Sequence, residues 1–554
     1  MKNKSEIKFT AMKQYLLIGV LKPQCRKILL SAAFGALSAI CNLTLLSKIS
    51  DFFNRNSDYY TVFLSFIFLL AGCISGFLSE YFINLVAERT AVSLREDFCE
   101  RVLQTPLLYV EKVGGTTLYN IVQADISVIQ AWTRTMPYLI SDIITITGAI
   151  IWLSFISLYS SLILLTFLFF GVSAYLIFSK FSEQYYTRSF LSNNEFFKKV
   201  NEVISGVKEL KISRFRAKHF KINRFTPSAQ NSLNANMKTL NLMAIVNQWG
   251  RLLFFLLILV IYFTQSNFQV DRGVFATFAM MIIFLMGPVS SVLSTLVDIA
   301  SVRSSLKRIL SFNEVSDTTF ISSELKTETV PFNTITLNEV TFSYDYCANS
   351  SYSIGPISVE FKEGELNFII GGNGSGKSTF LKVLSGLYIP VSGTILYSNS
   401  IQGPTAMNPY DTDSVSAIFQ DFHLFEDLPF WNEESNYSNY AVELIDILGL
   451  GDKVSILNGS FNTLLLSYGQ KKRLALIQSI LEDRKVYIFD EWAADQDPVY
   501  KEIFYKKILP DLVKRRKIVI ITTHDDKYFH CADHLFKFDY GLITKEEDRP
   551  EAFT

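Results

Sequence analysis

The amino-acid sequence predicts a two-domain protein, in which an all-α domain of six membrane-spanning helices precedes an α/β domain. Long apolar runs fill the chain up to about residue 305, whereas short strand-like and helical patterns alternate after about residue 330. A mean hydropathy of +0.24 with 19% charged residues is also unusual for a soluble protein. The expected boundaries are 1–311 for the membrane domain, 312–332 for a Ser-, Thr- and Glu-rich linker and 333–554 for the α/β domain.

Six apolar segments of the first half are long enough to cross a bilayer. A hydrocarbon core of about 30 Å requires about 20 residues of helix. Six such runs within about 300 residues disfavour the alternative, which is a soluble bundle of buried helices. The expected spans are Lys27–Ser50, Tyr60–Val86, Pro137–Phe155, Ser160–Ser179, Leu240–Thr264 and Gly273–Val297.

Basic residues indicate the orientation of these spans. Lys and Arg are concentrated at the N-terminus and in the long connection after the fourth span, and such segments remain in the cytoplasm. Both termini and the α/β domain are therefore expected on the cytoplasmic side of the membrane. The same connection alternates its basic residues with Glu195, Glu202 and Glu209, and Lys+Arg (52) equal Asp+Glu (52) over the chain. We therefore expect a solvated helix there and no nucleic-acid partner.

A phosphate-binding loop is the strongest motif of the second half. The run GGNGSGKST follows the apolar strand Leu366–Ile370 and precedes a helix, which is the context that such a loop requires. Its backbone amides and the helix N-terminus would surround the phosphates of a nucleotide. Lys377 would reach the β- and γ-phosphates, and Ser378 would bind Mg²⁺. The residues expected to bind nucleotide here are Gly371, Asn373, Gly374, Ser375, Gly376, Lys377, Ser378 and Thr379.

Two consecutive acids end a second buried strand, Val486–Asp490. Asp490 is placed to hold Mg²⁺. Glu491 follows it and is the expected general base, or the group that orients the attacking water. The alternative is a strand followed by an acidic turn without catalytic function.

The order of these motifs resembles the ATPase domain of ABC transporters. It runs from the phosphate loop through Gln420 and the sequence LSYGQ to the acidic strand and His524. The resemblance implies ATP hydrolysis, with catalytic roles for Glu491, for Gln420 as a γ-phosphate sensor that also binds Mg²⁺, and for His524. It also implies that two copies pair and share two ATP molecules. Further nucleotide contacts are implied for Tyr344, which would stack on adenine, for Ser467, Gly469 and Gln470 in LSYGQ, and for Asp497. Tyr468 departs from the glycine that is commonest at its position.

Longer segments resemble one branch of that family, the bacterial exporters of cyclic peptides and siderophores, including pyoverdine-type and syringomycin-type products. The segments are DEWAADQDP, HDDKYF and GVKELKISRFR. This implies a homodimer in the bacterial inner membrane that exports a peptide, siderophore or related secondary metabolite with ATP and Mg²⁺. A lipid or drug exporter, an ATP-gated channel and a non-transporting regulator of the same fold are the alternatives. A soluble nucleic-acid-linked ATPase is opposed by the six spans.

Overall fold

A computed structural model describes residues 24–54, 59–268, 272–319, 332–344, 352–399, 405–406, 412–429, 431 and 437–548. The chain divides into two compact units. The first comprises Met1–Thr105 and Val110–Phe320, and the second comprises Pro106–Tyr109 and Ile321–Thr554.

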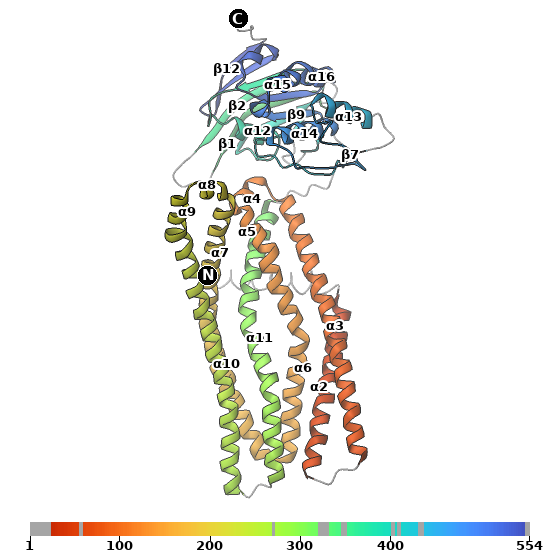
Figure 1. Ribbon diagram of the computed structural model, residues 1–554, viewed down its shortest axis with the longest axis vertical. Coiled ribbons are helices and arrows are strands. Elements are labelled where there is room, and N and C mark those ends of the chain that lie inside the picture. Colours follow the sequence, from red (N-terminus) through yellow and green to blue (C-terminus); the bar gives the residue numbers. More distant parts are fainter. Residues whose placement is uncertain are drawn as a thin grey trace. The chain divides into compact units, whose positions relative to one another are not determined.

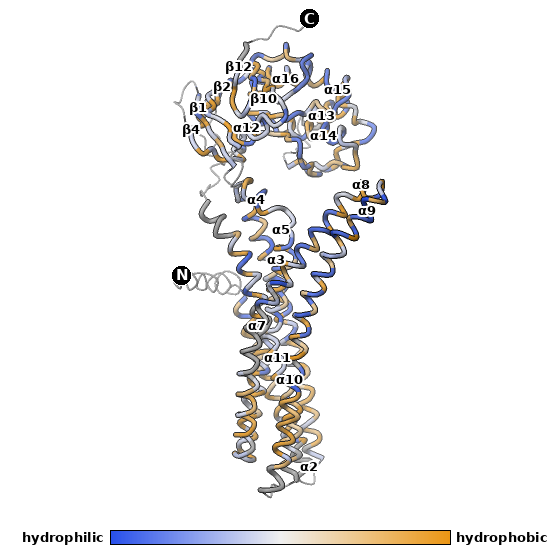
Figure 2. The backbone as a smooth tube through the Cα atoms, turned by 90° about the vertical axis from the view of Figure 1, so that its left-hand side faces the viewer, coloured by the Kyte–Doolittle hydropathy of each residue, from blue (hydrophilic) through white to orange (hydrophobic). Residues whose placement is uncertain are grey.

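The first unit is a bundle of long helices (Figure 1). Each of the six expected spans lies in one of six described helices of 30 or more residues. Hydrophobic residues are concentrated in the part of the bundle that is distant from α8 and α9, and hydrophilic residues are concentrated near α8 and α9 (Figure 2). The six helices are α2 (Cys25–Asn54), α3 (Tyr59–Gln104), α6 (Ile126–Ile156), α7 (Leu158–Ser205), α10 (Thr226–Phe268) and α11 (Arg272–Thr319).

By length and composition, four helical stretches within the described residues are able to cross a membrane, and the third of them includes α5 and η3 as well as α6. The stretches are Cys25–Ile49, Val62–Gln104, Gly115–Ile156 and Thr277–Thr295. The fourth and fifth expected spans contain shorter described apolar stretches, Ser161–Gly171 and Gln248–Phe263.

Short helices occupy the two long connections. They are α4 (Leu107–Val113), α5 (Gly115–Asn120) and the π-helix η3 (Ile121–Asp125) between α3 and α6, and α8 (Val207–Ile212), α9 (Arg214–Phe220) and the π-helix η4 (Lys221–Phe225) between α7 and α10. Gly114 separates α4 from α5 with a φ of 81°, a left-handed conformation that favours glycine.

Small polar residues hold α2 against α3. The Ser31 hydroxyl donates to the Ser79 carbonyl at 2.8 Å, and the Ser79 hydroxyl donates to the Ser31 carbonyl at 2.8 Å. The Ser38 hydroxyl donates to the Gly72 carbonyl at 2.9 Å. Small side chains allow two helices to approach closely, and hydrogen bonds between helices replace the hydrophobic effect that lipid cannot supply.

A buried carboxylate links three elements of the same unit. Asp125 at the end of η3 is 2% exposed. Its Oδ1 accepts a hydrogen bond from the Ser305 hydroxyl at 2.9 Å and also contacts Arg308 Nη2, and its Oδ2 accepts from Arg308 Nε at 2.9 Å. The Arg308 guanidinium lies 3.8 Å from the centre of the Phe190 ring. The ion pair thus joins η3 to α11 and, through the aromatic ring, to α7.

The end of α11 lies inside the segment expected to be a linker. The helix continues to Thr319, and Phe312 is buried with its ring 5.1 Å from that of Phe98. This apolar contact extends the helical region beyond the composition change that suggested the linker. Residues 320–331 of the expected linker lie outside the described residues.

The described part of the second unit contains two large sheets and a small two-stranded sheet of β7 (Ile456–Leu457) and β8 (Ser460–Phe461). A six-stranded sheet has the order β12-β11-β3-β10-β9-β6, in which β12 alone runs antiparallel to its neighbour. A four-stranded antiparallel sheet has the order β2-β1-β4-β5. The strands are β1 (Thr334–Ser343), β2 (Ser353–Lys362), β3 (Leu366–Ile370), β4 (Ser392–Ser398), β5 (Thr405–Ala406), β6 (Val415–Ile418), β9 (Val486–Asp490), β10 (Ile518–Thr522), β11 (His534–Asp539) and β12 (Leu542–Asp548).

Two apolar cores lie on opposite faces of the six-stranded sheet, because successive side chains of a strand point to opposite faces. Tyr487 and Phe489 of β9 belong to one core, and Val486 and Ile488 belong to the other. Every residue of β9 and β10 is buried, as expected for central parallel strands. The helices of this unit include α12 (Lys377–Leu384), α13 (Tyr437–Ile447), α14 (Tyr468–Leu481), α15 (Pro498–Ile503) and α16 (Leu509–Lys514).

The Asp125–Arg308 pair yields a prediction about stability. Arg308→Ala should lower the free energy of unfolding by about 3 kcal/mol, because it leaves the buried Asp125 carboxylate without its cation. Thermal unfolding of the purified protein in detergent measures this change. Lys307→Ala, at an exposed position of the same helix, is the matched control, and equal stability of the two variants would contradict the role of the pair.

Candidate nucleotide site

The loop between β3 and α12 wraps tightly around a space at the carboxyl end of the sheet. Gly374 and Gly376 have φ values of 78° and 109°, in the region that favours glycine. A Cβ at Gly376 would lie 2.5 Å from Tyr352 Oη, and one at Gly371 would lie 2.1 Å from the Phe538 carbonyl oxygen. Glycine at these positions therefore avoids backbone strain, and at Gly371 and Gly376 it also avoids close contacts.

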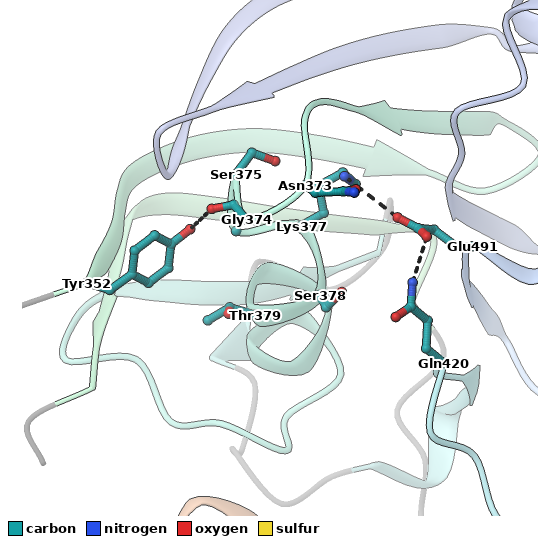
Figure 3. A pocket seen from close by; sticks show the side chains of 10 residues that line it. Tyr352, Asn373, Gly374, Ser375, Lys377, Ser378, Thr379, Gln420 and Glu491 are labelled. Atoms are coloured by element: carbon teal, nitrogen blue, oxygen red, sulfur yellow. Dashed lines mark hydrogen bonds and ion pairs between the residues drawn. The ribbon is translucent and has the colours of Figure 1, made fainter. Parts of the chain in front are cut away.

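A pocket of about 380 Å³ adjoins this loop. Figure 3 shows its lining side chains, which come from the loop, the start of α12, the residue before β2 and the segments after β6 and β9. The lining residues are Tyr352, Asn373, Gly374, Ser375, Gly376, Lys377, Ser378, Thr379, Gln420 and Glu491. The structure thus brings most of the expected nucleotide-binding residues together with two of the expected catalytic ones.

Lys377 places a cation at the centre of the loop. Its Nζ donates to the carbonyl oxygens of Gly371 at 2.8 Å and Gly372 at 3.1 Å, and it lies 3.8 Å from Glu491 Oε1. Burial lowers the pKa of the Lys377 ammonium, whereas the negative charges of Glu491 and Asp490 oppose this shift. An ammonium in this position would attract the phosphates of a nucleotide.

Asp490 lies buried at the end of β9 beside the next strand of the sheet. Its Oδ1 accepts a hydrogen bond from Thr522 Oγ1 at 2.7 Å, because the register of β9 and β10 pairs these two residues. Burial raises the pKa of the Asp490 carboxyl, and hydrogen bonds from Thr522 and Ser378 oppose the shift. Ser378 and Asp490, both expected to bind Mg²⁺, are therefore in contact.

The other two expected catalytic residues, Gln420 and His524, lie beside the Glu491 carboxylate. Gln420 Nε2 donates to its Oε2 at 2.6 Å (Figure 3), and His524 Nε2 lies 3.1 Å from its Oε1. The same His524 atom is 3.3 Å from Lys377 Nζ. Gln420, Glu491 and His524 follow β6, β9 and β10, so three neighbouring strands place them at one edge of the sheet.

The backbone of Glu491 is unusual. Its φ of 49° and ψ of 40° lie in the left-handed region, which residues other than glycine seldom adopt. Its N–H donates to Thr522 Oγ1 at 2.9 Å, and this bond helps to hold the turn. Such conformations are concentrated at functional sites.

The residues of LSYGQ lie at the start of α14 and do not line this pocket. Ser467 and Gln470 form a capping box: Ser467 Oγ accepts from the Gln470 N–H at 3.4 Å, and Gln470 Oε1 accepts from the Ser467 N–H at 3.1 Å. Gly469 accepts a hydrogen bond from Gln496 Nε2 at 3.0 Å. Asp497 precedes α15 and is exposed.

Two tyrosines lie close to the loop in different ways. Tyr344, expected to stack on adenine, has its hydroxyl 3.1 Å from Thr379 Oγ1 and its ring edge-on to Phe342 and Tyr388. Tyr352 lines the pocket and donates to the Gly374 carbonyl at 3.2 Å. The stacking role of Tyr344 stays a prediction.

Sequence reasoning missed Tyr352 and Thr522. Thr522 ends an apolar strand two residues before His524, and a polar residue at that end of a parallel strand is a usable signal. Tyr352 carries no comparable signal, because only folding of β2 brings it to the loop.

The described residues suit a magnesium–nucleotide complex. Ser375 Oγ is buried and has no hydrogen-bond partner among the described atoms, so it remains able to donate to a phosphate. No group of three or more His, Cys, Asp or Glu side chains that could hold a metal occurs in the described ranges. Mg²⁺ commonly binds through one or two protein ligands together with substrate phosphates, and Ser378 and Asp490 fit that pattern.

Comparisons with known proteins cover both units. The ABC transporter family profile matches residues 354–494, and the profile of the ABC transporter transmembrane region matches residues 27–289. The ATP-binding protein SyrD of Pseudomonas syringae pv. syringae is 31% identical over 535 residues, which cover 92% of this chain and 93% of that protein. The putative hemin import ATP-binding protein HrtA of Staphylococcus aureus (strain Newman) is 29% identical over 201 residues, 34% of this chain and 89% of that protein.

A solved structure shares the fold over nearly the whole chain. It is a bacterial Atm1-family ABC exporter with ATP bound, which matches with a TM-score of 0.75 at 18% identity and covers 96% of both chains. The expected fold class, a helical membrane domain followed by an ATP-binding α/β domain, is confirmed. The chain therefore belongs to the ABC transporter family, and its ATP-binding domain is an ATPase coupled to transport across a membrane.

Proposed function

We propose that this protein exports a peptide, a siderophore or a related secondary metabolite across the bacterial inner membrane, as a homodimer with two ATP sites between the copies. The observation that carries the proposal is the arrangement of Gln420, Glu491 and His524 around the phosphate loop. These groups suit hydrolysis of the terminal phosphate as well as binding of a nucleotide.

The chemistry of each group follows from its position. The Lys377 ammonium and the loop amides would bind the phosphates. Ser378, Gln420 and Asp490 would hold Mg²⁺, which neutralises negative charge on the phosphates. The Glu491 carboxylate would accept the proton of the water that attacks the γ-phosphorus. His524, beside both Lys377 and Glu491, would stabilise the charge on the departing phosphate.

A second copy explains the position of the LSYGQ motif. Ser467, Gly469 and Gln470 open α14 without lining the pocket of their own domain. A helix N-terminus carries partial positive charge and free N–H donors. In a head-to-tail pair of ATP-binding domains, these groups and Asp497 would approach the nucleotide held by the partner copy.

The proposed class of cargo rests on a similarity to a known protein that covers the membrane domain as well as the ATP-binding domain. The match to SyrD spans 92% of the chain, whereas the match to HrtA spans 34% and carries no argument about cargo. Basic connections support a topology with both termini in the cytoplasm. A lipid or drug exporter is the alternative within transport, and an ATP-gated channel or a non-transporting regulator is the alternative outside it.

Glu491→Gln should lower the kcat of ATP hydrolysis by at least about 100-fold, because an amide cannot accept the proton of the attacking water. ATP affinity should be retained, since Lys377 and the loop are intact. Phosphate release and ATP binding by the purified protein in lipid nanodiscs measure the two effects. Turnover at the wild-type rate would rule out the proposed base.

Sealed inverted membrane vesicles containing the protein should accumulate peptides from an extract of the producing cells when ATP is supplied. Vesicles with Glu491→Gln are the matched control, because that variant should bind ATP without turnover. Mass spectrometry of the vesicle contents identifies the cargo. Accumulation of lipid or drug alone would favour the first alternative, and an ATP-gated ion flux without accumulation would favour a channel.

Tyr344→Ala should raise the Kd for ATP by about ten-fold, the effect expected when stacking on a base is lost. Tyr352→Ala is the informative comparison, because Tyr352 lines the pocket and Tyr344 does not. Nucleotide titration of both purified variants measures the change. Unchanged affinity in Tyr344→Ala with a loss in Tyr352→Ala would assign the adenine contact to Tyr352 instead.

A further inference from the structure

We propose that Tyr468 is a positioning residue whose hydroxyl links the start of α14, where the LSYGQ motif lies, to the backbone of Gln420 and thereby holds the Gln420 amide against Glu491. The Tyr468 Oη donates to the Gln420 carbonyl oxygen at 2.7 Å. The side chain of the same Gln420 donates to Glu491 Oε2 at 2.6 Å (Figure 3). One residue of the helix thus holds the residue that contacts the catalytic carboxylate.

The tyrosine is itself held in place. It is the first residue of α14, and the capping box formed by Ser467 and Gln470 fixes the direction in which the helix starts. Its ring lies 6.0 Å from the ring of Phe422, two residues after Gln420. Phe422 in turn packs against the larger apolar core of the domain. The contact between helix and loop is therefore both polar and aromatic.

Lys472, in the next turn of α14, contacts Glu491, which is the other partner of the Gln420–Glu491 contact. Lys472 is four residues after Tyr468, on the same helix face, and is 1% exposed. Its Nζ donates to the Glu491 carbonyl oxygen at 3.1 Å and contacts Asp495 Oδ2 at 2.7 Å. The ammonium also lies 5.4 Å from the centre of the Tyr468 ring. A single face of α14 consequently positions Gln420 and Glu491 together.

The direction of this hydrogen bond follows from its two partners. A carbonyl oxygen can only accept, so the Tyr468 hydroxyl is the donor to Gln420. Glycine, commonest at this position in the family, would provide neither the hydroxyl nor the ring.

The contact also has a consequence that rests on the proposed homodimer. There, the start of α14 faces the ATP of the partner copy, while Gln420 and Glu491 serve the ATP of their own domain. Tyr468 of one chain would then connect the two ATP sites of the dimer. Movement of α14 caused by the ATP of the partner copy would displace Gln420 directly.

Tyr468→Phe tests the proposal, because it removes the hydroxyl and keeps the ring. ATP hydrolysis by the full-length protein in nanodiscs should lose about three- to ten-fold in kcat, the effect of one neutral hydrogen bond, while the KM for ATP changes less than about two-fold. Tyr468→Gly should lose at least as much kcat. Tyr540→Phe, at a tyrosine that is 89% exposed, is the control and should match the wild type.

A double-mutant cycle separates positioning from a general structural role. Gln420→Ala removes the side chain that contacts Glu491 but keeps the carbonyl that Tyr468 binds. If Tyr468 acts through Gln420, adding Tyr468→Phe to Gln420→Ala should not lower kcat further. Additive losses, or a Tyr468→Phe enzyme with wild-type kcat, would overturn the proposal while leaving ATP-driven export intact. A wild-type protein without ATPase activity would overturn both.

Discussion

The parallel register of β3, β10 and β9 is the constraint on which the ATP-binding domain depends. It places the phosphate loop after β3, His524 after β10, and Asp490 and Glu491 at the end of β9, all at one edge of the sheet. The hydrogen bond between Thr522 and Asp490 follows directly from that register. A slip of one residue would turn every side chain of the strand to the opposite face and would separate the carboxylate from the loop. Close packing of alternate β9 and β10 side chains into the two cores opposes such a slip.

Sequence alone predicted the parts of the site that are continuous in the chain. The phosphate loop is one such part, because its glycines and Lys377 have a fixed spacing and a strand–loop–helix context. Glu491 is another, because it directly follows an apolar strand. Contacts between distant segments could not be predicted. Tyr352 reaches the loop only after β2 has folded, and the bond from Tyr468 to the Gln420 backbone joins residues whose spacing obeys no local rule.

The membrane domain shows the same division. The six apolar runs lie in six long helices of the described structure, because length and hydrophobicity are local properties of a span. The contacts that specify how those helices pack are polar and distant in sequence. Ser31 and Ser79 exchange hydrogen bonds between α2 and α3, and Arg308 pairs with Asp125, which lies 183 residues earlier in the sequence. Composition also suggested an early end to α11, whereas burial of Phe312 against Phe98 keeps the chain helical beyond that point.

The backbone conformation of Glu491 limits which residues evolution can place there. β-Branched side chains are disfavoured with φ near 49°, so Val, Ile and Thr would distort the turn as well as remove the acid. Asp and Asn tolerate this conformation better, but their shorter side chains would draw the polar group back from Gln420 and His524. Gly would relieve the backbone strain but would make the turn before Trp492 more flexible. Each of these substitutions therefore changes either the length of the polar side chain or the rigidity of the turn.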